Sequence, residues 1–145
     1  MKLLSDLTKA KSSLYLKYKS TMENILLLLG QVILGGYFFL MGINHITRSE
    51  SLIGYADSKG VPSPKLGNYI ASALLILGGL GIIAGLYMTV SASLIILFLV
   101  AVNFMIHNFW NAKSEDEKSS DMQHFLKNTA LIGALLIVIA RSIMG

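Results

Sequence analysis

Four long apolar stretches constrain the fold of this chain more than any other feature. They run over Asn24–Ile43, Asn68–Leu86, Val90–Phe109 and Phe125–Met144. Each is close to the roughly 20 residues that a helix needs to cross a hydrocarbon core of about 30 Å. Because the apolar residues are continuous and do not alternate with polar ones, helices are favoured over membrane β-strands. We therefore predict an all-α, polytopic integral membrane protein with four transmembrane helices in an antiparallel bundle.

The composition agrees with this class of protein. Hydrophobic residues make up 54% of the 145 residues and charged residues only 14%, which is far from the usual balance of a soluble domain. The net charge of +4 comes mainly from lysines near the N-terminus, and such a segment is expected to meet anionic lipid. We expect the lipid bilayer as a partner and no nucleic acid.

The N-terminal segment sets the expected orientation. Residues 1–22 carry five lysines and a single acidic residue, Asp6, so the positive-inside rule keeps them in the cytoplasm. We expect this segment to be an amphipathic helix on the inner leaflet or a flexible tail, and residues 23–145 to form the transmembrane domain. Four crossings then return the C-terminus to the cytoplasm. The loops Asn44–Gly67 and Asn111–His124 lie outside, and the turn Tyr87–Thr89 lies inside.

Polar residues gather at the ends of three of the expected helices. His45 ends the first, His107 lies near the end of the third, and His124 opens the fourth. Antiparallel threading brings these three ends to the same membrane surface. Helical spacing adds Asn108 and Trp110 beside His107, and Lys127 and Asn128 beside His124. The sequence therefore predicts a shallow polar pocket that opens at the outer face.

Several of these residues also have purely structural interpretations. Trp110 is typical of an aromatic residue at headgroup depth, Lys127 can extend its ammonium to the interface, and Asn68 can cap a helix. The glycines of the first two helices are interpreted as packing surfaces, because small residues let membrane helices approach closely. These are Gly30, Gly35, Gly36, Gly42, Gly78, Gly79, Gly81 and Gly85. The acidic run Glu115–Glu117 is interpreted as a solvated loop.

The chemistry of the predicted pocket suits a carbonyl-bearing ligand. Histidine and lysine donate hydrogen bonds to a carbonyl oxygen, and histidine can exchange a proton near neutral pH. A quinone head group at the bilayer edge would match. The chain has no cysteine, so we expect no thiol chemistry and no covalently bound cofactor. We expect no metal, since no helix presents two histidines four residues apart.

Four separated motifs resemble the DoxX family of small four-helix membrane proteins. They are Gly36–His45, Tyr55–Pro62, Met105–Trp110 and His124–Asn128, and the resemblance extends over about residues 25 to 140. It implies a multi-pass protein of the plasma or inner membrane, similar to the small subunit of an archaeal thiosulfate:quinone oxidoreductase. The resemblance adds three residues to the motif set without assigning them roles: Tyr55, Gly60 and Pro62. The candidate ligand-binding residues are then His45, Tyr55, His107, Asn108, Trp110, His124, Lys127 and Asn128.

Two functions of different classes remain open, and with them the question of whether the chain is an enzyme. In the first, the chain is a quinone-linked oxidoreductase subunit that works with a membrane or redox partner protein. In the second, it is a non-catalytic scaffold or assembly factor whose polar end binds another protein. A solute transporter is less favoured, because four spans without a broken-helix repeat would need a homo-oligomer.

Overall fold

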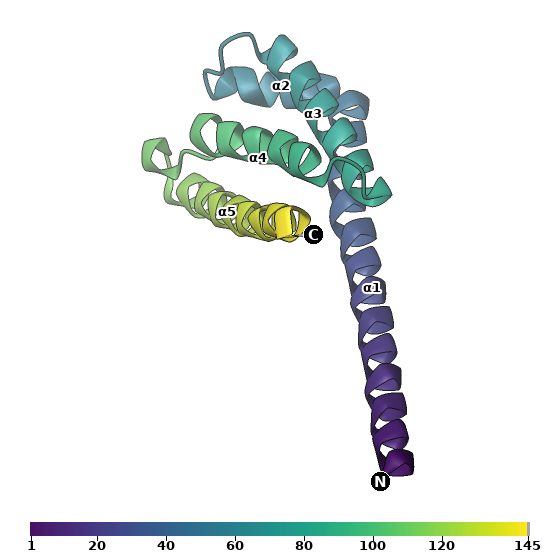
Figure 1. Cartoon of the computed structure of the whole chain (residues 1–145). Helices are drawn as coiled ribbons and strands as arrows, with labels where there is room; N and C mark the ends of the chain where they lie inside the picture. The colour runs from purple at the N-terminus through teal and green to yellow at the C-terminus, as the bar shows by residue number, and fades with distance from the viewer. Residues whose placement is uncertain (145) are drawn as a thin grey trace.

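The computed structural model describes residues 1–144, with side chains for all of these except 3 and 4. Six helical elements follow one another along the chain (Figure 1). They are α1 (Lys2–Thr47), α2 (Ser49–Ser58), α3 (Pro64–Ala84), α4 (Met88–Met105), the 3-10 turn η1 (Phe109–Asn111) and α5 (Glu115–Met144). No strand occurs within residues 1–144. The predicted class is confirmed: α1, α3, α4 and α5 are long and apolar enough to cross a membrane.

The four long helices pack in chain order. α1 lies against α3, α3 against α4, and α4 against α5, because short connections make consecutive helices antiparallel neighbours. Side chains from all four helices meet in one core that includes Phe38, Leu75, Ile95, Leu99 and Leu135. α1 and α5 therefore stand at the two ends of the row.

Glycines allow the close contacts of the first three spans. A Cβ on Gly79 would lie 2.6 Å from the backbone nitrogen of Phe39, and one on Gly35 would lie 2.7 Å from the carbonyl oxygen of Gly79. Gly42, Gly78 and Gly81 face similarly close neighbours, so the packing interpretation is confirmed for these five. Gly30 and Gly36 meet nothing within 4 Å. Gly85 ends α3 in the left-handed conformation, with φ of 67°, and so acts as a helix cap.

The N-terminal part of α1 stands clear of the other helices (Figure 1). Every side chain described between Met1 and Gly30 is exposed, and packing begins at Gln31. The helix continues through the predicted boundary between residues 22 and 23 without a break, so a helix and not a flexible tail is present. The exposed stretch 25–29 is apolar and is the part of span one that lipid would cover. Gly145, the last residue of the predicted domain, lies outside the described residues.

Two connections that were expected to be loops contain helix. α2 occupies part of the connection between α1 and α3, and α5 begins at Glu115, ten residues before the expected start at Phe125. The interpretation of Glu115–Glu117 as a loop was therefore wrong, although Glu115 and Asp116 are exposed. Ser114 provides the reason: its Oγ accepts a hydrogen bond from the Glu117 backbone N–H at 3.2 Å, and this cap starts the helix.

Candidate functional site

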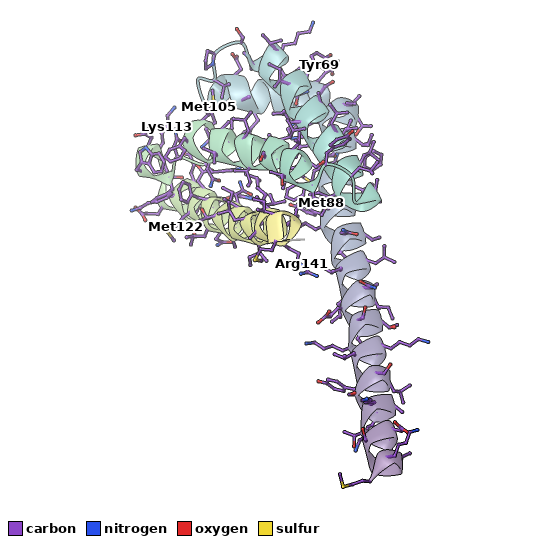
Figure 2. All side chains as sticks on the ribbon, viewed as in Figure 1. Tyr69, Met88, Met105, Lys113, Met122 and Arg141 are labelled. Carbon is purple, nitrogen blue, oxygen red and sulfur yellow. The ribbon has the colours of Figure 1, made fainter. Side chains whose placement is uncertain are left out.

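A cavity of about 460 Å³ lies between the helices towards the end of the molecule where α1 and α4 finish and α5 begins. In Figure 2 this end carries the labelled Met105 and Lys113, while Met88 and Arg141 mark the opposite end. Aliphatic and aromatic side chains such as Phe38, Leu75 and Phe98 form most of its wall. The polar lining residues are His45, Tyr55, Asn68, His107, His124, Lys127 and Asn128. All three histidines of the chain thus meet one cavity, as antiparallel threading predicted.

Two of the histidines touch each other. The rings of His107 and His124 stack with centroids 4.7 Å apart and planes 17° from parallel. One turn further along α5, the Lys127 ammonium lies 3.2 Å from His124 Nδ1. Because an ammonium has donors and no acceptor, Lys127 donates and His124 Nδ1 accepts. The ring proton of a neutral His124 then lies on Nε2.

His45 has partners of its own, separate from those of the other two histidines. Asn68 donates from Nδ2 to the backbone carbonyl of His45 at 2.9 Å, so its Oδ1 faces the imidazole and accepts from His45 Nδ1, also at 2.9 Å. The ring also packs edge-on against Phe98, with centroids 5.6 Å apart. Asn68 is buried within α3, which begins at Pro64, so it does not cap the start of that helix. Its amide instead donates to a carbonyl in the last turn of α1.

A buried carboxylate joins His107 to the connection between α2 and α3. Asp121, on α5, is 2% exposed. Its Oδ1 lies 3.3 Å from His107 Nδ1, and its Oδ2 lies 2.7 Å from the Lys59 ammonium. Lys59 also donates to Glu117 Oε1 at 2.6 Å. One lysine at the end of α2 therefore ties the α2–α3 connection to the first two turns of α5.

Lys59 stays charged in this position. Burial disfavours its ammonium, but the hydrogen bonds to Asp121 and Glu117 outweigh that effect and raise the pKa of Lys59 above its usual range. Its ammonium also lies 5.7 Å from the centre of the Tyr55 ring, where a cation is attracted to the aromatic face. The result is an ion-paired lysine directly behind the cavity wall.

Six of the eight candidate residues line the cavity, and two lie outside it. Trp110 is 51% exposed and packs with Phe109 and Phe125, at centroid separations of 5.2 and 5.9 Å, which matches the interpretation as an interfacial aromatic. Asn108 precedes η1, and its carbonyl accepts from the Asn111 N–H. Among the six, Asn128 is buried and donates to Asn103 Oδ1 at 2.9 Å, which links α5 to α4.

Sequence reasoning missed Lys59, Glu117 and Asp121. A signal was present for two of them: Ser114 followed three residues later by Glu117 is a helix-start pattern. Had α5 been extended back to this point, Asp121 would have fallen on the same helical face as His124 and Asn128. Lys59 carries no such signal, since its partners lie 58 and 62 residues away in the chain. No group of metal-ligating side chains forms among the described residues.

The fold and the cavity define a multi-pass membrane protein of four spans with a largely apolar cavity that several polar side chains line. The chain belongs to the DoxX family, whose family model, described as DoxX, matches residues 26–108. This match ends before α5, so the motif residues His124, Lys127 and Asn128 lie beyond it, although the resemblance was expected to reach about residue 140. No curated protein and no solved structure matches the chain.

Proposed function

We propose that the cavity binds the head group of a lipid-soluble carrier, with a quinone as the best fit, and that the chain serves as a quinone-linked subunit of a membrane oxidoreductase. One observation carries the proposal: an apolar-walled cavity of about 460 Å³ has its three histidines and Lys127 gathered at one end. Cavities of about 300–1,000 Å³ with apolar walls and a few convergent polar groups are typical ligand sites. Apolar walls suit a quinone ring and the first units of its tail.

The polar end offers complementary hydrogen-bonding groups. A carbonyl oxygen of a bound quinone would accept from His124 Nε2–H or from the remaining N–H groups of Lys127. A hydroxyl of the reduced form would donate to an imidazole nitrogen without a proton. We infer that the protein lies in the plasma or inner membrane with both termini in the cytoplasm, which places this end of the cavity at the outer face. The electron donor or acceptor would be a partner protein.

Binding of a short-chain quinone analogue to the purified protein in lipid nanodiscs tests this function. We expect Lys127→Met to weaken binding by about 10-fold or more, since hydrogen bonds from charged groups contribute about 1.5–3 kcal/mol. Lys65→Met is the matched control, because Lys65 is exposed and does not line the cavity. Thermal unfolding of each variant separates loss of binding from loss of folding. Absence of binding by the wild type would contradict the proposal and favour the scaffold alternative.

A further inference from the structure

Asp121 is a buried carboxylate that lies behind the cavity and does not line it. Its two oxygens have different partners: Oδ2 accepts from Lys59 at 2.7 Å, and Oδ1 faces His107 Nδ1 at 3.3 Å. The side chains of Lys59 and Asp121 are 11% and 3% exposed. A buried carboxylate this close to a lysine is ionised, because the charge on each side chain stabilises the other. Asp121 can then only accept hydrogen bonds.

This geometry settles which nitrogen of His107 carries the ring proton. An acceptor-only carboxylate requires a proton on His107 Nδ1, so Nε2 of the neutral ring is left with a lone pair. The stacked partner His124 has the opposite arrangement, because Lys127 donates to its Nδ1. The two parallel rings at the cavity therefore differ in function: His107 offers an acceptor nitrogen and His124 offers a donor N–H.

We propose that Asp121, held by Lys59, is a positioning residue that keeps His107 as a hydrogen-bond and proton acceptor facing the bound ligand. The cavity therefore takes a head group that bears a hydroxyl, of the hydroquinone class. This inference rests on the proposed function, whose site it uses. The ligand hydroxyl donates to His107 Nε2. When its proton moves there, the O–H bond breaks, an N–H bond forms, and the ligand oxygen keeps the electron pair as a phenolate. Asp121 balances the imidazolium, while His124 and Lys127 stabilise the phenolate.

The positioning role can be measured without any ligand. The chain has three histidines, so ring-¹⁵N-labelled histidine in nanodiscs gives three sets of signals, assigned with His45→Gln and His124→Gln. We expect neutral His107 in the wild type to carry its proton on Nδ1. In Asp121→Asn the asparagine amide can donate to Nδ1 instead, which moves His107 towards the Nε2–H tautomer. Asp121→Glu should retain the wild-type tautomer.

Asp116→Asn is the matched control, since Asp116 lies on the same helix but is exposed, and it should leave the signals of His107 unchanged. Should Asp121→Asn fail to fold, the wild-type spectrum still decides the matter. A His107 that carries its proton on Nε2 in the folded wild type would overturn the inference.

The ligand class is tested with a decyl-substituted hydroquinone and its dimethyl ether under argon. The ether keeps the ring and its oxygens but cannot donate, so we expect it to bind the wild type roughly 10-fold more weakly, the loss of about one hydrogen bond. His107→Gln and Asp121→Asn should reduce this ratio. Equal binding of the two compounds to the wild type would overturn the ligand class, even if His107 carries its proton on Nδ1 as expected. If neither compound nor the quinone binds, the proposed function is overturned. The tautomer of His107, measured without ligand, would still decide the positioning role of Asp121.

Discussion

At the scale of single residues, the arrangement of polar side chains around His107 depends on the pairing of Lys59 with Asp121. Lys59 has two carboxylate partners within 2.7 Å, and one of them is buried. Exposed ion pairs contribute little to stability, but a buried charge that loses its partner carries the full cost of its desolvation. Loss of Lys59 would therefore cost more stability than the ion pair contributes, because it would leave the buried Asp121 carboxylate without its partner.

We predict that Lys59→Met lowers the free energy of unfolding by about 1–3 kcal/mol, the usual cost of leaving a buried polar group unsatisfied. Thermal unfolding in detergent micelles measures the loss. Lys65→Met, on an exposed lysine near the start of α3, should change the stability little. The double variant Lys59→Met/Asp121→Asn should recover part of the loss, because it no longer leaves a buried charge at position 121 without its lysine partner. Equal stability of Lys59→Met and Lys65→Met would contradict this prediction.

At the scale of the helices, backbone contact between α1 and α3 determines where His45 lies. Gly35 and Gly42 on α1 meet Gly79 and Ile76 on α3 at distances that leave no space for a Cβ. Such close approach increases dispersion contacts, which drive helix association where lipid provides no hydrophobic force. The same register places His45 opposite Asn68 at 2.9 Å. Helix packing and the geometry of the site are thus coupled.

We predict that Gly79→Ala destabilises the protein by about 1–3 kcal/mol, as overpacking in a close-packed interior does. The added Cβ would lie 2.6 Å from the Phe39 nitrogen, so α1 and α3 must separate. Gly36→Ala is the matched control, because its Cβ would meet nothing within 4 Å, and alanine favours helix over glycine. Thermal unfolding of the two variants checks the difference, and a Gly79→Ala variant as stable as Gly36→Ala would contradict this prediction.

At the scale of the whole molecule, four crossings place both termini on one side of the membrane and the connections around α2 and η1 on the other. The convergence of His45, His107 and His124 was predictable, because alternating helix directions bring these ends together whatever the details of packing. The side of the membrane on which the termini lie is predicted from the lysines of residues 1–22 alone. That orientation remains a prediction.

Cysteine labelling gives a direct measurement of the orientation, because the chain contains no cysteine of its own. Ser119→Cys lies near the start of α5 and Ser13→Cys in the N-terminal part of α1, and both positions are exposed. We predict that a membrane-impermeant maleimide labels Ser119→Cys on intact cells and Ser13→Cys only after permeabilisation. The reverse pattern would invert the topology and place the cavity at the inner face.

By itself the sequence determined the class of the fold, the number of crossings and the end of the molecule at which polar groups meet. Apolar runs of about 20 residues carry that information locally, because bilayer thickness sets helix length. Only the tertiary structure decided that His107 stacks on His124 while His45 pairs with Asn68, and that Asp121 is buried between His107 and Lys59. These contacts depend on how each helix is rotated and how the α2–α3 connection folds over α5. Rotation and chain path arise from packing between residues far apart in the chain, which no local pattern records.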